Sequence, residues 1–209
     1  VLSPSILKAR RGVFEAVEGA DLNRPPFTTR LHLTDGGVYD NMGLEPVWKR
    51  ARVVLVSDGG GTFDFESDRN WLMRLLRYNT IIGNQARAIR KRWLIASFIE
   101  RVMEGTYWGT SSAVESYSGT AGVGYSKELA ASVISEVRTD LDAFSDGEIA
   151  VLENHGYLLA DAAIQVHAPQ LLPDPVPPLE IPYPEWMDEA RVRAALRHSH
   201  QLKLPFGRR

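Results

Sequence analysis

Residues 33–46 read L-T-D-G-G-V-Y-D-N-M-G-L-E-P, and this stretch has the strongest bearing on the fold. Glycine accepts backbone angles that other residues avoid, so Gly36 and Gly37 allow a sharp turn that can present the Asp35 carboxylate in a cleft. Taken alone, D-G-G is also typical of an ordinary surface turn, in which Asp35 accepts hydrogen bonds from nearby amides.

The residues on either side extend this pattern into a mixed α/β arrangement. L-H-L before the glycines alternates like a short strand, and Asn41 and Gly43 suit a second tight turn after them. A short helix is expected at 44–50. The run R-V-V-L-V-S at 52–57 is bounded by D-G-G-G, which indicates a buried strand that is central and parallel.

Helices dominate the rest of the chain. Ser145 and Glu148, spaced as a capping box, predict a helix start, and Gly156 predicts its end. The proline-rich stretch 169–184 predicts an extended arm. Apolar spacing and composition predict four further segments: a helix at 67–101 with a break at Gly83, a strand with a long loop at 105–126, and helices at 157–166 and 185–198.

Composition narrows the classes of function. The chain has 209 residues, 44% of them hydrophobic, which suits a globular core. Its net charge of −2 argues against a nucleic-acid partner. There are no cysteines, so disulfides and thiolate metal sites are excluded. No apolar run is long enough to predict a transmembrane helix.

The stretch 33–46 resembles the D-G-G motif of bacterial patatin-like phospholipases, in which an Asn and a small residue follow the glycines. Other segments agree with that family in kind and order. They are L-S-P near the start, V-V-L-V-S-D-G-G-G, R-A-I-R-K-R-W-L-I, Y-W-G-T and E-N-H-G-Y. The resemblance covers residues 1–168 and leaves out the arm at 169–184 and the helix and basic tail at 185–209.

The resemblance implies an α/β/α sandwich and a serine–aspartate dyad that hydrolyses acyl esters of lipids without a cofactor or metal. Asp35 would be the dyad aspartate, with Gly36, Gly37, Asn41 and Gly43 as motif support. The family's G-x-S-x-G elbow is absent: G-T-S-S-A and G-Y-S-K-E both lack the closing glycine. The chain is therefore interpreted as the C-terminal half of the domain. We expect it to be inactive and prone to aggregation without the N-terminal half.

Other interpretations remain open beside this one. Asp58, in S-D-G-G-G, is a rival carboxylate, although a strand-end turn explains it equally well. Asp35 and Asp40 could suggest a metal site, but an EF-hand spacing is absent. His155, beside Gly156, is interpreted as a helix-end residue. A non-catalytic interaction or membrane-surface module is the alternative function.

The predicted partners are a lipid or other acyl ester and the missing half of the domain. The cluster Arg87, Arg90, Lys91 and Arg92 suits either a solvated helix face or peripheral contact with an anionic membrane, and the basic tail supports the second weakly. The predicted location is cytoplasmic, with peripheral membrane contact. Because the chain begins with Val1, a targeting signal before it stays open.

Overall fold

The computed structural model describes residues 5–8, 24–27, 30–33, 35–61, 70–117, 122–139 and 142–201. The chain divides into two compact units, Val1–Val47 and Trp48–Arg209, and each is described by itself. The sequence predicts a different division, into 1–168, 169–184 and 185–209. That division rests on the family resemblance and on composition, which the two compact units do not test, so it stays a prediction.

The first unit contains an antiparallel strand pair followed by helical turns. Strand β1 (Ser5–Lys8) pairs with β2 (Arg30–Leu33), with Ser5 opposite Leu33. The one-turn helix α1 (Gly37–Asp40) follows the D-G-G residues, and α2 (Glu45–Trp48) leads into the second unit. The strand predicted before the glycines and the short helix predicted near Leu44 are therefore both confirmed.

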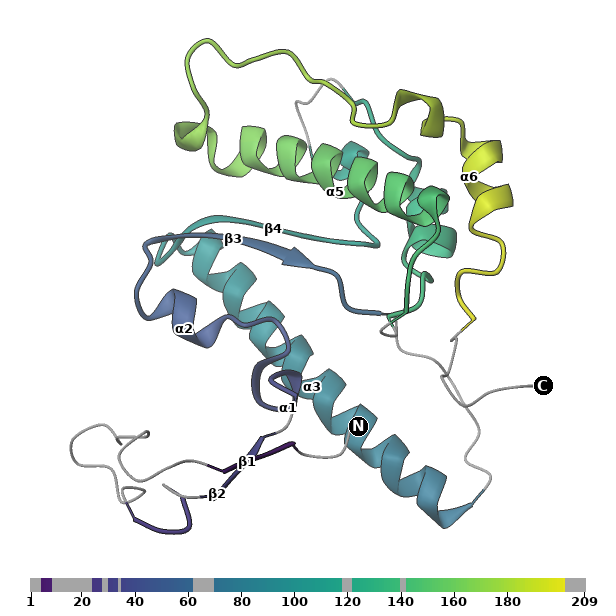
Figure 1. Cartoon of the computed structure of the whole chain (residues 1–209). Helices are drawn as coiled ribbons and strands as arrows, with labels where there is room; N and C mark the ends of the chain where they lie inside the picture. The colour runs from purple at the N-terminus through teal and green to yellow at the C-terminus, as the bar shows by residue number, and fades with distance from the viewer. Residues whose placement is uncertain are drawn as a thin grey trace. The chain divides into compact units, whose positions relative to one another are not determined.

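The second unit is organised around a strand–helix–strand motif (Figure 1). Strand β3 (Val53–Asp58) runs parallel to β4 (Glu104–Gly109), and helix α3 (Trp71–Ile99) connects them. The predicted parallel strand is confirmed. Its predicted central position is not seen, because β4 is its one partner among the described residues. The break predicted at Gly83 is wrong, since α3 continues through it.

Two helices cover opposite faces of this sheet. Tyr107 of β4 faces α3, where the Lys91 ammonium lies 4.4 Å from the centre of its ring. The next residue, Trp108, faces the other way and packs with Leu158 and Leu159 of α5 (Asp146–His167). Figure 1 shows α3 below the sheet and α5 above it. This layering is that of an α/β fold.

A glycine in β4 allows the two strands to approach closely. Gly105 has φ +130°, and a Cβ placed there would lie 1.9 Å from the carbonyl oxygen of Val54. Only glycine fits this position, because other residues rarely adopt that angle and the Val54 backbone occupies the space.

The remaining helices pack around α5, with α6 and η4 against its N-terminal half. Two apolar cores form there, one between α5 and β4 and one centred on Val151, Leu129 and Val192. The shorter helices are η1 (Val114–Ser116), α4 (Lys127–Leu129), the π-turn η2 (Ala130–Ile134), η3 (Pro169–Leu171), η4 (Pro184–Trp186) and α6 (Glu189–Ala195).

The start of α5 was predicted correctly and its end was not. The side chain of Ser145 accepts from the Glu148 amide, and the Glu148 side chain accepts from the Ser145 amide, which is the expected capping box. The helix then passes through Gly156 and ends at His167, so the two predicted helices are one. Between η3 and η4, residues 172–183 form no helix or strand and are largely exposed.

Candidate functional site

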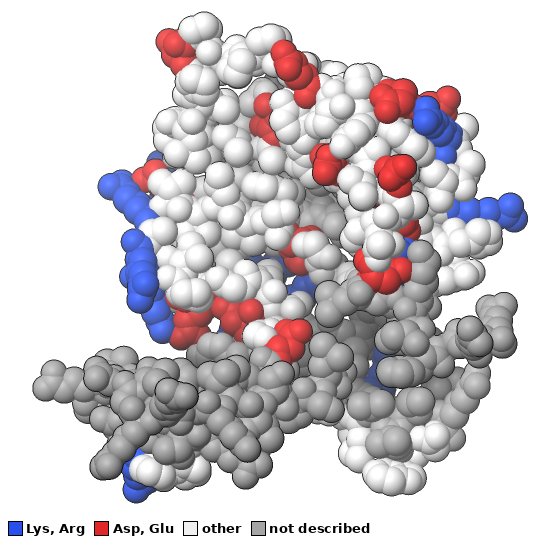
Figure 2. Space-filling view, viewed as in Figure 1, with Lys and Arg blue, Asp and Glu red and all other residues white. Residues whose placement is uncertain are grey.

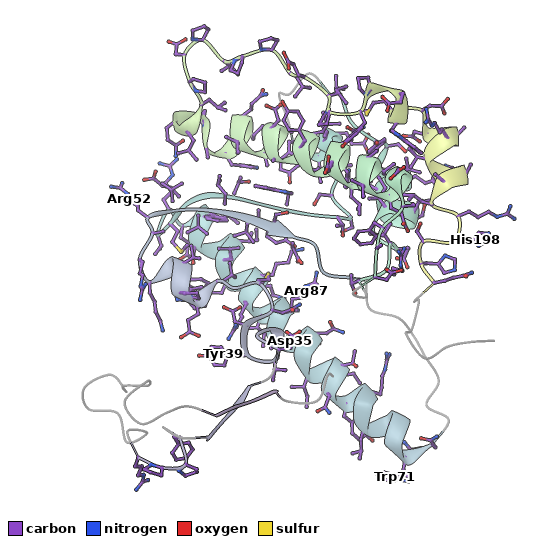
Figure 3. The ribbon with its side chains drawn as sticks, viewed as in Figure 1. Asp35, Tyr39, Arg52, Trp71, Arg87 and His198 are labelled. Carbon is purple, nitrogen blue, oxygen red and sulfur yellow. The ribbon has the colours of Figure 1, made fainter. Side chains whose placement is uncertain are left out.

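In the first unit, Asp35 begins the helical turn that the glycines make possible. Its side chain is exposed, and its Oδ1 accepts a hydrogen bond from the Gly37 amide at 2.7 Å. This is the local amide contact expected of a D-G-G surface turn. The same contact fixes one carboxylate oxygen and leaves the side chain at the protein surface (Figure 3).

Three of the predicted motif residues converge at this turn. A Cβ placed on Gly37 would lie 2.5 Å from Asn41 Oδ1 and 2.9 Å from Asp35 Oδ1, so both side-chain oxygens lean over this glycine. No atom would lie within 4 Å of a Cβ on Gly36. A side chain at the second glycine would therefore displace the Asp35 and Asn41 side chains, whereas one at the first glycine would meet open space. Gly43, with φ +61°, supplies the second turn that was predicted.

Asp40, the other carboxylate of this stretch, has a structural contact. Its Oδ2 accepts from the Glu45 amide at 2.7 Å, which joins α1 to the start of α2. Asp35 and Asp40 thus both accept from amides of their own turns. Within the described ranges of the chain, no group of three or more His, Asp or Glu side chains is placed to hold a metal ion.

In the second unit, Asp58 forms the centre of a polar cluster at the carboxyl end of β3. Arg87 of α3 donates to both of its oxygens, from Nη2 at 2.7 Å and from Nε at 3.3 Å. The Tyr107 hydroxyl donates to Oδ2 at 2.7 Å, and the Gly60 amide donates to Oδ1 at 3.1 Å. The carboxylate is buried and surrounded by donors.

These donors decide the charge of Asp58. Burial acts to raise its pKa, but the hydrogen bonds from Arg87, Tyr107 and the Gly60 amide outweigh burial and lower the pKa below its usual value. Burial, together with the hydrogen bond to Asp58, raises the pKa of the Tyr107 hydroxyl. A carboxylate held anionic by four donated hydrogen bonds is a weak proton acceptor.

Arg87 also holds the glycine loop that follows β3. Its Nη1 donates to the Gly61 carbonyl at 3.0 Å and its Nη2 to the Gly60 carbonyl at 3.2 Å. A Cβ on Gly60 would lie 2.6 Å from the Arg87 guanidinium carbon, so this glycine packs flat against the group. The cluster joins α3, β3 and β4 into one structural unit.

The sequence reasoning did not identify this cluster. Asp58 was considered as a rival base or a strand-end turn residue, Arg87 as part of a basic helix face, and Tyr107 only as part of the Y-W-G-T segment. The one signal available was a strand-end carboxylate followed by a helix rich in arginine. It does not say which arginine reaches the carboxylate.

The basic cluster on α3 is not a single exposed surface. Arg87 is paired with Asp58, and the Lys91 ammonium lies over the Tyr107 ring, so both side chains extend toward the sheet. Arg90 is half-buried, whereas Arg92 is exposed.

The two near-matches to the serine elbow also differ in their surroundings. Ser126 caps α4, and its amide and hydroxyl both donate to Glu189. Ser112 follows β4 and accepts from the Gly109 amide at 3.1 Å, as a turn serine does. Ser111 is exposed beside it.

His155 lies in the middle of α5, so its interpretation as a helix-end residue is wrong. Its Nε2 lies 2.8 Å from the Thr110 carbonyl, and burial lowers its pKa. A neutral imidazole that donates to a carbonyl oxygen links α5 to the loop after β4. The helix continues past Gly156 because the apolar cores hold α5 on both sides of it.

No family model, curated protein or solved structure matches this chain. Among the described residues, no helix combines the length and apolar character needed to cross a bilayer.

Proposed function

We propose that this chain supplies the aspartate of a patatin-like serine acyl hydrolase, with Asp35 as the base that accepts the proton of a serine hydroxyl. A serine hydroxyl becomes an effective nucleophile only when a positioned base takes its proton. The 209 residues contain no G-x-S-x-G elbow, so the proposal requires that the serine come from a further polypeptide segment. The substrates would be acyl esters of lipids.

The single observation that supports this proposal most is the geometry of the D-G-G turn. The spacing of Asp35, Gly37 and Asn41 brings two side-chain oxygens close to this glycine, so that a Cβ placed there would lie 2.5 Å from Asn41 Oδ1 and 2.9 Å from Asp35 Oδ1. One oxygen of Asp35 is held by the Gly37 amide, and the side chain remains exposed to an incoming group. A base must be both fixed in place and accessible to the proton that it accepts.

The hydrogen bonding of Asp58 supports the choice of Asp35 as the base. It carries the only other aspartate–glycine–glycine sequence, yet its oxygens already accept from Arg87, Tyr107 and Gly60. To serve as a base it would have to give up these hydrogen bonds. The layered α/β arrangement of the second unit is compatible with the sandwich that the proposal assumes.

The test is the substitution Asp35→Asn in a polypeptide that joins this chain to its serine-bearing segment. An asparagine can still accept from the Gly37 amide, so the turn is kept, but it cannot take the serine proton. We expect ester hydrolysis to fall by about 10²-fold or more. The matched control is Gly36→Ala, which changes the same turn where space is open and should leave turnover within about twofold.

Two results would contradict the proposal. Full activity in Asp35→Asn would mean that a residue other than Asp35 serves as the base. A loss confined to Asp58→Asn, in a protein whose thermal unfolding is unchanged, would transfer the role to the other aspartate. The 209-residue chain alone should not react stoichiometrically with a fluorophosphonate serine probe.

A further inference from the structure

Helix α3 carries an apolar stripe on the side that faces away from the sheet. At about 100° per residue, its members fall within an arc of about 60° around the helix axis. Leu94 and Arg87, which face the sheet, lie more than a quarter turn away from that arc. The exposed members and their exposed fractions are Trp71 (72%), Leu75 (48%), Tyr78 (52%), Ile82 (66%) and Ile89 (59%).

The stripe is too large to be ordinary surface variation. Single exposed apolar side chains are common, but five on one face over 19 residues extend along about 27 Å of the helix. Figure 3 shows Trp71 at the end of α3 that lies farthest from the β3–β4 sheet. At the other end, Trp93 contacts Trp48, with ring centres 4.3 Å apart, and stays 43% exposed. The side chains between these ends need a partner that buries apolar surface.

Charge on the same helix indicates what that partner is. Helix α3 contains six basic residues and no Asp or Glu, although the whole chain has 26 acidic residues against 24 basic ones. Arg87 and Lys91 extend toward the sheet, where Arg87 pairs with Asp58, and Arg92 is exposed. Acidic side chains are spread over the part of the molecule that carries α5, the arm and α6 (Figure 2). A second copy of α3 would bring like charges together, so the helix favours an anionic partner.

We propose that α3 docks through this stripe on the surface of an anionic lipid bilayer. Exposed Trp and Tyr combine an apolar ring with a polar tip, which suits the boundary between acyl chains and headgroups. Arg74 and Arg92 lie beside the stripe on one flank of the helix and would meet the headgroups. The helix would lie in the plane of the membrane, with its apolar side chains among the acyl chains.

The inference rests on the proposed function in one respect: a lipid acyl hydrolase has to reach its substrate at a lipid surface. Docking can nevertheless be measured without hydrolysis. It also places membrane contact on the outward stripe from Trp71 to Ile89 rather than on Arg87 and Lys91, which face the sheet.

The experiment is co-sedimentation of the full chain with vesicles of phosphatidylcholine and phosphatidylglycerol, compared with phosphatidylcholine alone. The test variant combines Leu75→Gln, Ile82→Gln and Ile89→Gln. The matched control replaces three apolar residues that are exposed elsewhere, Val102, Leu171 and Val176, with Gln. Both variants should unfold at the temperature of the unsubstituted protein, because exposed side chains contribute little to stability.

We expect the unsubstituted chain and the control to bind the anionic vesicles, with binding weakened by salt. The stripe variant should partition at least about tenfold less, because three apolar side chains no longer leave water. Emission from Trp71 should shift to the blue on binding and be missing in Trp71→Phe. Asp35→Asn should bind like the unsubstituted chain, so a failure of the proposed catalysis is separable from a failure of docking.

Three results would overturn the inference. They are absence of binding to the anionic vesicles, equal binding by the stripe variant and the unsubstituted chain, and self-association of the unsubstituted chain that the stripe substitutions abolish. The last result would make the stripe a protein interface.

Discussion

Asn154 and Tyr183 exchange two hydrogen bonds across 29 residues of sequence. The Tyr183 amide donates to Asn154 Oδ1 at 2.9 Å, and Asn154 Nδ2 donates to the Tyr183 carbonyl at 2.7 Å. Asn154 is a fully buried residue of α5. Its side-chain amide takes the place of the water molecules that would otherwise form hydrogen bonds with the backbone of the arm at Tyr183. This pair fixes the returning end of the proline-rich arm on the helix.

The substitution Asn154→Ala should therefore lower the free energy of unfolding by about 1–3 kcal/mol, because it removes both hydrogen bonds to the part-buried amide and carbonyl of Tyr183. Urea denaturation measures the change. The control is Gln165→Ala, an exposed amide on the same helix that bonds to Asp161, for which a change within about 0.5 kcal/mol is expected. Equal effects of the two substitutions would show that the arm is not held through Asn154.

The substitution Gly60→Ala should destabilise the second unit by about 1–3 kcal/mol, because the new methyl group displaces the Arg87 guanidinium from Asp58. The neighbouring Gly59→Ala meets open space and is the matched control. Thermal unfolding of the two variants gives the comparison. If Gly60→Ala unfolds like Gly59→Ala, the guanidinium does not depend on its flat contact with this glycine.

Glu148 should make stability depend on pH in the acid range. Burial acts to raise its pKa, but hydrogen bonds from Ser145, Ser199 and Arg138 outweigh burial and lower that pKa to about 2. A carboxylate whose pKa is lower in the folded than in the unfolded protein stabilises the folded state. For Glu148 this stabilisation is complete above pH 4.5, its unfolded pKa, and is lost as the pH falls towards 2.

Urea denaturation at several pH values tests this linkage. The free energy of unfolding of the unsubstituted chain should fall more steeply between pH 4.5 and 2 than that of Glu148→Gln. Glu115→Gln, at an exposed glutamate, should keep the steep dependence. A Glu148→Gln curve parallel to that of the unsubstituted chain would remove Glu148 as its source.

Two helical glycines offer a gain in stability. Gly83 in α3 and Gly156 in α5 lie in helical backbone, and a Cβ at either position meets no atom within 4 Å. Replacing either with Ala should raise the free energy of unfolding by about 0.5–1 kcal/mol, because alanine loses less backbone entropy in a helix. A lower stability of either variant in urea denaturation would mean that the glycine has a role beyond filling the helix.

The same two glycines mark what sequence reasoning could and could not predict. The capping box at Ser145 and the position of strand β3 were predicted correctly because each depends on neighbouring residues, whereas the partner of β3 lies about 50 residues along the chain. The helix ends expected at the glycines were wrong, because a cost of about 1 kcal/mol per glycine is smaller than the stabilisation that packing gives a long helix.

The residues of the two aspartate sites also differ in how far the sequence predicts them. Asp35, Gly37 and Asn41 were identified because they lie within seven residues and shape one turn. Arg87 approaches Asp58 from 29 residues away, and nothing in its local sequence separates it from its basic neighbours on α3. Contacts of this kind depend on how a helix crosses a sheet, which the spacing of apolar residues does not determine.

The arm between η3 and η4 is attached at both ends and exposed between them. Its far end is held by Asn154 and by Tyr125, whose hydroxyl donates to the Trp186 carbonyl at 2.9 Å, and α6 beyond it packs into the core through Val192 and Leu196. A protease that cut the exposed residues 173–180 would therefore leave two fragments still bound to each other. The C-terminal segment behaves as a separable piece that could be supplied in trans, and the chain connecting it could be lengthened at little cost.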